Sequence, residues 1–340
     1  MKPRRLAAMG VALAAKATGY LAWWNRRRHR RGDFRVFILE YHDVAEGGGE
    51  KEGTVSRRRF RRHLRWLSKR YRFTTVAQAA EALRRGDLTE DLMVVTFDDG
   101  YAGNADAAFP VLQEVGVPAT IYLTTGFLDG EGLWFDIARR CLDAAGGAAA
   151  AEVGPDLRER LVGTLGAWPP ERSIDSQIRQ LKALPAAVRE AAVEDLRAAG
   201  LDTGTPARPM TWDQARQLRD AGIELGAHTH SHPILSRLDA EGQEREIIRS
   251  RERITEELGE EPVTFAMPNG SEQDYDHATL DILRRLGFAA ACTTRRGANV
   301  PGEDLLQLRR LGIGADPLPL LEARLAGLFD EGLRRQLPFT

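Results

Sequence analysis

Short apolar runs rich in β-branched residues alternate along the chain with longer segments whose apolar residues recur at helical spacing. This alternation is typical of a parallel α/β fold, in which helices connect successive strands. Seven runs are predicted to be strands: 36–41, 93–97, 119–124, 223–227, 263–267, 288–293 and 308–313. Seven strands with helical crossovers predict an α/β fold built on an incomplete or distorted (β/α) barrel.

Helix boundaries are visible in the segments between the strands. Thr211 followed by Gln214 is the pattern of a capping box and predicts a helix over 212–220. The segment 236–258 is rich in Glu and Arg, which is more typical of a solvated outer face than of a binding site. We therefore expect this helix to cover the barrel.

Two further segments shape the expected domain organisation. Residues 34–340 are predicted to form one catalytic domain, interrupted at 132–208 by an Ala-rich helical insertion that either borders the substrate groove or only packs outside the barrel. The segment 318–337 is predicted to be an amphipathic helix that covers the barrel. No internal repeat is visible.

The N-terminal segment 1–33 differs from this body, because it carries nine Lys/Arg and one acid. Its apolar stretch 6–24 has 19 residues, close to the roughly 20 that a spanning helix needs, although Lys16 lies in the middle. A signal-anchor helix, a cleavable signal peptide, a surface-lying amphipathic helix and a disordered basic tail remain as alternatives. We expect a membrane-associated protein of the cell envelope. The basic cluster after the apolar stretch favours a cytoplasmic body, but the side of the membrane stays open.

Composition narrows the classes of function. Hydrophobic residues make up 43% and charged residues 29% of the 340, as in a globular protein. Beyond residue 33 the chain has 39 basic and 48 acidic residues, and such an acidic body argues against nucleic acid as a partner. Cys141 and Cys292 make neither a disulfide framework nor a zinc–thiolate cluster, so a metal must be held by His and carboxylate.

Two clusters of polar residues directly follow predicted strands, where active sites of parallel α/β proteins assemble. Asp98 and Asp99 are adjacent carboxylates, which are costly unless a cation compensates them, and Gly100 permits a turn that lets both reach one pocket. The alternative is an ordinary Asp-Asp-Gly turn. Three of the seven histidines fall in 228–232. If Pro233 starts a helix, the preceding turn lets two of these histidines approach one ion.

Within the second cluster, His228 and His232 are four residues apart. Two neutral imidazoles and a carboxylate with an open position form the pattern of a catalytic divalent site such as zinc. His230 would then face elsewhere and line the pocket. The alternative is a polar surface loop. A third segment, 265–270, is by itself only a strand that runs into a turn.

Together, Thr-Phe-Asp-Asp-Gly-Tyr, His-Thr-His-Ser-His-Pro and Phe-Ala-Met-Pro-Asn-Gly resemble the polysaccharide deacetylase family, the NodB-homology carbohydrate esterases. The likeness extends from Tyr41 to about Ile313. It implies a distorted (β/α) barrel that removes acetyl groups from N-acetylated sugars with a divalent ion, zinc above all, with cobalt or nickel as alternatives. The resemblance assigns the following roles: Asp98 as general base for a metal-activated water, Asp99, His228 and His232 as metal ligands, the backbone N–H of Tyr101 as oxyanion donor, and Pro268 and Asn269 as substrate contacts.

Two departures from the family pattern are visible. Many members supply the final proton from a late Leu-x-His motif, whereas the last histidine here is His277, on a predicted helix. The arginine that often precedes the third motif is also missing. A subgroup associated with exopolysaccharide export has a similar Phe-Ala-x-Pro form and an Arg on the final strand, to which Arg310 corresponds. We expect Arg310 to pair with Asp98 and keep it ionised. His42 is a candidate pocket group or substitute acid, or else a histidine satisfied by the barrel rim.

Three functions follow from these residues. The leading one is a metal-dependent deacetylase acting on an N-acetylated glycan of an envelope polysaccharide pathway. The second is a hydrolase of O-acyl sugars or small amides using the same site. The third is a membrane-tethered glycan-binding or assembly protein whose catalysis has decayed. The missing late histidine favours the third, whereas four retained chemical residues argue against it.

Overall fold

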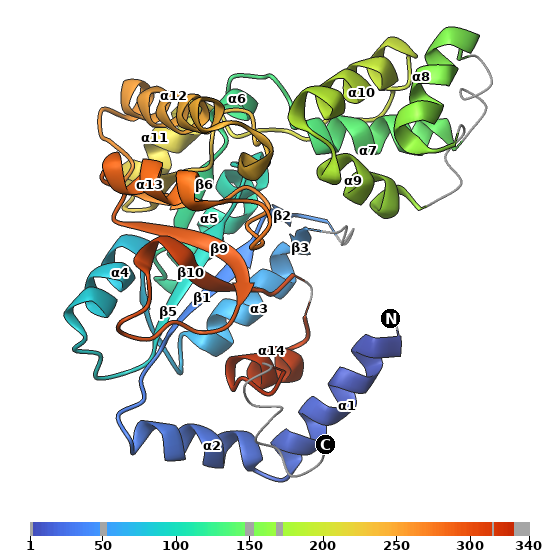
Figure 1. The fold of residues 1–340 in the computed structure, drawn as a ribbon. Coiled ribbons are helices and arrows are strands. Elements are labelled where there is room, and N and C mark those ends of the chain that lie inside the picture. The colour runs from blue at the N-terminus through green and yellow to red at the C-terminus, as the bar shows by residue number, and fades with distance from the viewer. Residues whose placement is uncertain (1–2, 48–52, 147–152, 168–172, 315, 330–340) are drawn as a thin grey trace.

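The computed structural model describes residues 3–47, 53–146, 153–167, 173–314 and 316–329, and it contains a closed barrel of seven parallel strands (Figure 1). Pairing between β1 and β5 closes the ring. In barrel order the strands are β1 (Val36–Tyr41), β10 (Leu308–Gly312), β9 (Ala290–Arg296), β8 (Thr264–Ala266), β7 (Glu224–Ala227), β6 (Thr120–Leu123) and β5 (Leu92–Phe97). The predicted fold class and all seven predicted strands are confirmed.

Three short strands were not predicted. β2 (Asp43–Ala45) and β3 (Thr54–Ser56) pair with each other, and β4 (Arg72–Thr74) extends the sheet on the first half of β5. Each has three residues, which is too short for an alternating pattern to be recognised against the background of the sequence.

The interior of the barrel changes from apolar to polar along the strands. At the amino end, inward residues of several strands pack against α4 (Val76–Arg85), which closes this end: Val36, Ile38, Leu92, Val94, Tyr122, Ala266 and Leu308. Because side chains alternate between the two faces of a strand, the same inward register continues to Glu40 in β1 and His42 just after it, and to Thr96 in β5 and Asp98 just after it. The carboxyl end of the barrel therefore collects the charged groups.

Helices cover the outside of the barrel and pack on the outward residues of the strands, such as Phe37, Leu39, Met93 and Val95. The capping box of Thr211 and Gln214 forms and opens α11. α12 begins later than expected, because Asp239 accepts a hydrogen bond from Gly242 N (2.8 Å) and caps it there. These helices are α3 (Arg57–Leu67), α5 (Phe109–Val115), α6 (Thr125–Leu128), α11 (Trp212–Asp220), α12 (Ala240–Leu258) and α13 (His277–Arg285).

The segment expected as a helical insertion forms four helices that stand out as a lobe at the upper right of Figure 1. They are α7 (Trp134–Ala145), α8 (Pro155–Leu165), α9 (Ile174–Ala183) and α10 (Ala186–Ala198). Their buried residues form a hydrophobic core separate from that of the barrel. The lobe begins close to the carboxyl ends of the strands, a position that matters for the site.

The N-terminal apolar stretch does not form one continuous helix. α1 (Pro3–Ala17) and α2 (Tyr20–His29) are separated at Gly19 (φ 72°) and bent by 69°. In the described residues no single helix has both the length and the apolar character needed to cross a bilayer. Only the two helices of this bent pair, taken together, have the required length and composition. α14 (Leu318–Leu325) packs against α1 and ends earlier than the predicted 318–337, while 330–340 lie outside the described residues.

Candidate active site

The two adjacent carboxylates lie in a tight turn at the carboxyl end of β5. Asp98 N donates to Tyr41 O (3.1 Å), and Asp99 (φ 72°) and Gly100 (φ 83°) then turn the chain through left-handed conformations. A Cβ at Gly100 would lie 2.8 Å from a methyl of Leu128, so both the left-handed conformation and the limited space favour glycine. The turn leaves both carboxylates buried, with 3% and 1% of each residue exposed.

Asp98 forms a buried, two-pronged ion pair with Arg310 of β10. Nη1 donates to Oδ1 at 2.7 Å and Nη2 to Oδ2 at 2.8 Å, while Nε donates to Thr293 O at 2.9 Å. Burial alone would raise the pKa of Asp98, but the charge and hydrogen bonds of Arg310 outweigh it and hold the pKa well below its usual range. The expected pairing is present, and Asp98 is ionised.

Asp99, His228 and His232 come together beside this pair. One potential ligand atom of each lies within 4.8 Å of the others. Asp99 Oδ1 is 3.5 Å from His228 Nε2 and 3.3 Å from His232 Nε2. His228 Nδ1 lies 2.8 Å from Ala266 O, an acceptor, so this nitrogen carries the proton and Nε2 keeps its lone pair toward Asp99.

The path of the histidine loop differs from the expected one. Pro233 does not start an α-helix. The chain instead turns through positive φ at Thr229 (64°) and at His232 (56°), and His232 N donates to Thr229 Oγ1 (3.2 Å). Two left-handed residues make the turn that brings the two histidines together, whereas the sequence analysis linked this turn to a helix start at Pro233.

The donor set fits a divalent cation. Both carboxylate oxygens of Asp99 are buried, and neither accepts a hydrogen bond from the described residues. Such orphaned acceptors are costly unless a cation satisfies them. Burial lowers the pKa of His232 well below its usual value, so this ring is neutral and has a lone pair to donate. One carboxylate and two neutral imidazoles match a catalytic divalent site with an open position.

His42 lies at the rim of the same pocket, next to Glu40 and Asp98. Its side chain is 39% exposed, and its Nε2 is 3.9 Å from Glu40 Oε1. Burial alone would lower the pKa of His42, but the negative charges of Asp99, Glu40 and Asp98 together raise it. Because Arg310 already compensates Asp98 and lies 4.0 Å from Glu40 Oε2, this group resembles a charge-balanced network more than a second cation site.

The expected substrate contacts, Tyr101, Pro268 and Asn269, are less closely connected to the potential metal ligands. The ring of Tyr101 packs edge-on against Phe127 (centroids 5.5 Å apart), and in the described part of the chain its backbone N–H donates no hydrogen bond, so that donor is available. Pro268 is buried, and Asn269 adopts φ 58° with its carbonyl accepting from Thr294 Oγ1 (2.7 Å). The Nδ2 of Asn269 is buried without a partner among the described residues. No hydrogen bond joins Pro268 or Asn269 to the three potential ligands in that part of the chain.

The insertion contributes contacts that sequence reasoning missed. Trp134 Nε1 donates to His232 O (3.0 Å), and the Phe135 ring packs edge-on against the His232 imidazole with centroids 5.0 Å apart. The start of the insertion therefore contacts one of the potential metal ligands. Two aromatic residues at the start of an Ala-rich segment were the only available sequence signal.

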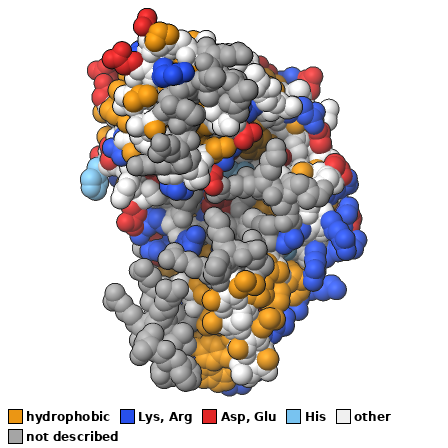
Figure 2. All heavy atoms as spheres, turned by 90° about the vertical axis from the view of Figure 1, so that its right-hand side faces the viewer, with side chains coloured by type: hydrophobic (Ala, Val, Ile, Leu, Met, Phe, Trp, Pro, Cys, Tyr) orange, Lys and Arg blue, Asp and Glu red, His pale blue; other side chains and the backbone are white. Residues whose placement is uncertain are grey.

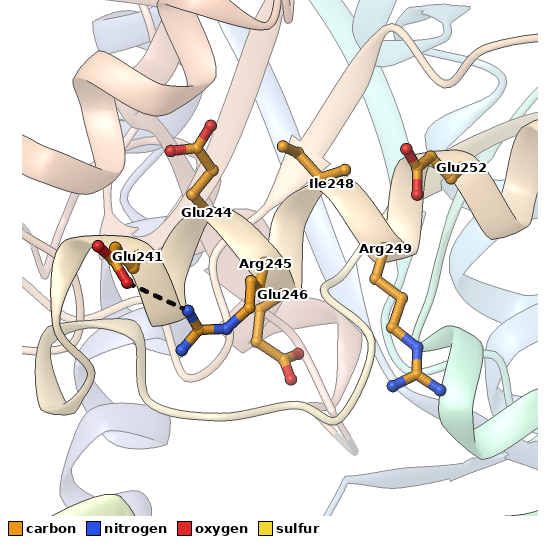
Figure 3. A pocket seen from close by; sticks show the side chains of 7 residues that line it. All are labelled: Glu241, Glu244, Arg245, Glu246, Ile248, Arg249 and Glu252. Atoms are coloured by element: carbon orange, nitrogen blue, oxygen red, sulfur yellow. Dashed lines mark ion pairs between the residues drawn. The ribbon is translucent and has the colours of Figure 1, made fainter.

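Glu246 of α12 was also missed. Its carboxylate accepts hydrogen bonds from His230 N (3.0 Å), Ser231 N (2.9 Å) and Ser231 Oγ (2.8 Å), all in the histidine loop. His230 itself turns away from Asp99, toward Thr125 Oγ1 (2.8 Å) and Glu131 Oε1 (3.2 Å). Glu246 also lines a surface hollow along the outer face of α12 that is separate from the candidate site (Figure 3). α12 is thus both a solvated helix and a support for the loop.

Comparison with known proteins places the chain among the polysaccharide deacetylases. Residues 85–291 match the family model described as polysaccharide deacetylase. The chain is 34% identical over 278 residues to "Putative polysaccharide deacetylase YxkH" of Bacillus subtilis (strain 168), covering 81% of this chain and 70% of that protein. Two solved structures share its fold. The Streptococcus pyogenes deacetylase PplD in complex with acetate has a TM-score of 0.57 and 20% identity, with 85% of this chain and 97% of that one covered. IcaB from Ammonifex degensii has a TM-score of 0.54 and 21% identity, with 86% and 97% covered.

The matched family region spans most of the barrel and includes both carboxylates of the turn and the whole histidine loop. Asp98 and the three potential metal ligands lie within this region, whereas His42 and Arg310 lie outside it. The chain belongs to the polysaccharide deacetylase family and is a hydrolase of the deacetylase type.

Proposed function

We propose that this protein removes N-acetyl groups from an N-acetylated glycan, with a divalent cation held by Asp99, His228 and His232. The observation that carries the proposal is the pair of buried, unsatisfied Asp99 oxygens facing two imidazoles, next to the ionised Asp98. Family membership supports the substrate class, since the family is named for polysaccharide deacetylation. Zinc is our first choice of metal, with cobalt or nickel as alternatives.

The residues of the chain divide the work as follows. Asp98 accepts a proton from the water whose oxygen attacks the acetamide carbonyl carbon, and Arg310 keeps Asp98 ionised for that purpose. The free N–H of Tyr101 donates to the oxygen that becomes negative in the tetrahedral intermediate. When bound, the cation supplies Lewis-acid activation of water and carbonyl.

The intermediate collapses by cleavage of the C–N bond, which gives acetate and a free amine, and the amine must receive a proton. In the absence of a late Leu-x-His motif, we assign this step to His42. It lies at the pocket rim beside Glu40 and Asp98, whose negative charges favour the protonated ring, and its partial exposure gives it access to substrate. Replacement of His42 by Ala is expected to lower kcat and leave metal content unchanged. A wild-type rate in His42→Ala removes this residue from the mechanism.

The test of the proposal has two stages. Metal content is measured on the full chain after addition of zinc, cobalt or nickel, for the wild type, Asp99→Ala and His228→Ala. About one ion per chain, lost in both variants, is the expected result. Acetate release is then compared between N-acetylated and O-acetylated oligosaccharides. Release from the O-acetylated substrate alone would replace the proposal with an O-acyl hydrolase, and absence of bound metal would favour a glycan-binding protein.

A further inference from the structure

Among the side chains of α1 that the structure describes, from Leu6 to Ala17, the exposed residues are apolar apart from Lys16. Leu6, Val11 and Leu13 are exposed by 57%, 52% and 49%, the highest values among the large hydrophobic residues of the described chain. The only charged residue between 6 and 17 is Lys16, and its ammonium pairs with Glu322 (2.7 Å). Figure 2 shows a continuous apolar area on the lower part of the molecule, where α1 lies in Figure 1. A helix face of this kind is normally buried in protein or lipid.

The opposite face of the helix pair is docked on the domain. Ala12 and Leu21 are buried against Leu320 and Ala323 of α14. Arg28 of α2 is 5% exposed and forms a two-pronged pair with Asp91, just before β5. The α1–α2 pair is therefore part of the folded body, and its free face has a fixed orientation relative to the barrel.

Positive charge borders the apolar face. Trp23 is 48% exposed, and the Arg27 guanidinium lies 5.5 Å from the centre of its ring. Arg26, Arg30 and Arg31 are exposed as well, and residues 1–32 contain no acid. An apolar helix face next to an exposed tryptophan and several arginines is complementary to the acyl and headgroup layers of an anionic membrane surface.

We propose that α1 and α2 lie in the interface of a bilayer containing anionic lipids, with the outer face of α1 in the acyl–headgroup boundary and the arginines of α2 against the headgroups. The 69° bend and the docking of α1 on α14 are incompatible with a straight spanning helix. A second copy of the chain is a poorer occupant, because pairing these faces would place two arginine clusters next to each other.

The position of the pair also orients the candidate active site. Asp91 and Asp98 flank the six residues of β5, so the docking point of α2 and the reacting groups are about 20 Å apart along the strand. If the substrate is a glycan, as proposed above, this orientation implies that it reaches the mouth of the barrel from the aqueous side, above the membrane surface.

The test is flotation of the full chain with phosphatidylcholine vesicles and with phosphatidylcholine vesicles containing phosphatidylglycerol. We expect binding to the anionic vesicles, release by alkaline carbonate, and binding at least about tenfold weaker to the neutral ones. Leu6→Glu/Leu13→Glu and Arg26→Ala/Arg27→Ala/Arg30→Ala are each expected to weaken binding by about tenfold or more. This readout needs no enzymatic activity, so it is independent of the proposed function.

Matched controls are Val263→Glu, which alters a residue 47% exposed elsewhere, and Arg158→Ala/Arg179→Ala/Arg237→Ala, which removes three exposed arginines outside α2. We expect both controls to bind as the wild type does, with unchanged thermal melts in every variant. Failure of the wild type to float, equal losses in the controls, resistance to carbonate, or a dimer in light scattering that Leu13→Glu dissociates would each overturn the interfacial assignment.

Discussion

Two buried arginine–aspartate pairs occupy the two ends of the same strand, β5. Asp91 precedes the strand and pairs with Arg28, and Asp98 follows it and pairs with Arg310. All four side chains are at most 6% exposed, and each pair uses two parallel hydrogen bonds. The residue types and the burial are the same, but the surroundings of the two carboxylates differ.

Asp91 is saturated with hydrogen-bond donors. Besides Arg28, it accepts from Arg35 N (3.0 Å) and lies 2.9 Å from His29 Nε2. In the described part of the chain, Asp98 accepts side-chain hydrogen bonds from Arg310 alone, and it lies next to His42 and the potential metal ligands. A carboxylate with spare acceptor capacity can take a proton from substrate water, whereas a saturated one can only hold structure. The comparison therefore distinguishes the Asp98–Arg310 pair, which can take part in catalysis, from the Asp91–Arg28 pair, which acts as a structural clamp.

The most direct test of this difference in role is to neutralise each aspartate in turn. Asp98→Asn removes the general base, and kcat for acetate release is expected to fall by about 10²–10⁴-fold with metal content retained. Asp91→Asn, 20 Å or so away along β5, is expected to leave kcat within about twofold of the wild type. Equal losses in both variants would show that the two pairs do not differ in role.

The second prediction concerns stability. Arg28→Ala leaves Asp91 buried without its cation, and the free energy of unfolding in urea is expected to fall by about 3–5 kcal/mol. The neighbouring exposed Arg27, changed to Ala, should alter it by about 0.5 kcal/mol or less. A small effect of Arg28→Ala would mean that the α1–α2 pair is not held by this clamp.

This stability difference should also depend on pH. Burial alone would raise the pKa of Asp91, but the hydrogen bonds of Arg28 and His29 lower it below that of the unfolded chain. The contribution is therefore complete above about pH 4, near the unfolded pKa, and is lost as the pH falls through the folded pKa. Wild type and Arg28→Ala should converge in stability under acid conditions.

The third prediction tests what Arg310 does to its partner. In Arg310→Met, burial is no longer opposed by the guanidinium, so the pKa of Asp98 should rise. The acidic limb of the kcat/KM profile should then move to higher pH, and Arg310→Lys should move it less. An acidic limb that stays in place would identify another group as the base.

Much of this architecture could be predicted from the sequence because its signals are local. The strands of the barrel are mostly apolar runs of three to seven residues, and the turn of Asp98 to Gly100 directly follows one of them. The pairing of Asp98 with Arg310 was expected only through the family resemblance, since the two residues are 212 positions apart. The docking of α2 was not predicted, because Arg28 is one of five arginines between 26 and 31 and nothing local distinguishes it.

Supporting residues were the hardest to predict. The histidine loop depends on left-handed backbone at Thr229 and His232, neither of which is a glycine that would signal it. Glu246 is one of many acids on a charged helix, and its contact with the loop arises only when α12 packs beside β7. Sequence periodicity places such a residue on a helix but does not say which loop will reach it.

Glu246 therefore provides the last and smallest test, and it extends the comparison to a third carboxylate, which is only half-buried. Two backbone N–H groups and one hydroxyl of the histidine loop donate hydrogen bonds to the Glu246 carboxylate. Glu246→Gln keeps the shape of the side chain but removes its negative charge, which weakens these bonds, and its amide N–H₂ would face one of the donors. Because the loop orients two potential metal ligands, metal affinity is expected to fall by about 10–100-fold. Activity at saturating metal should change less.

Glu252→Gln is the matched control, since Glu252 is an exposed residue of the same helix (Figure 3). Isothermal titration of zinc into both variants and the wild type separates the two outcomes. If only Glu246→Gln binds zinc more weakly, and excess zinc restores its rate of acetate release, then the loop is positioned by α12. Equal affinity in all three proteins would mean that the left-handed residues of the loop hold the histidines without help, because the backbone conformation is then sufficient for ligand geometry.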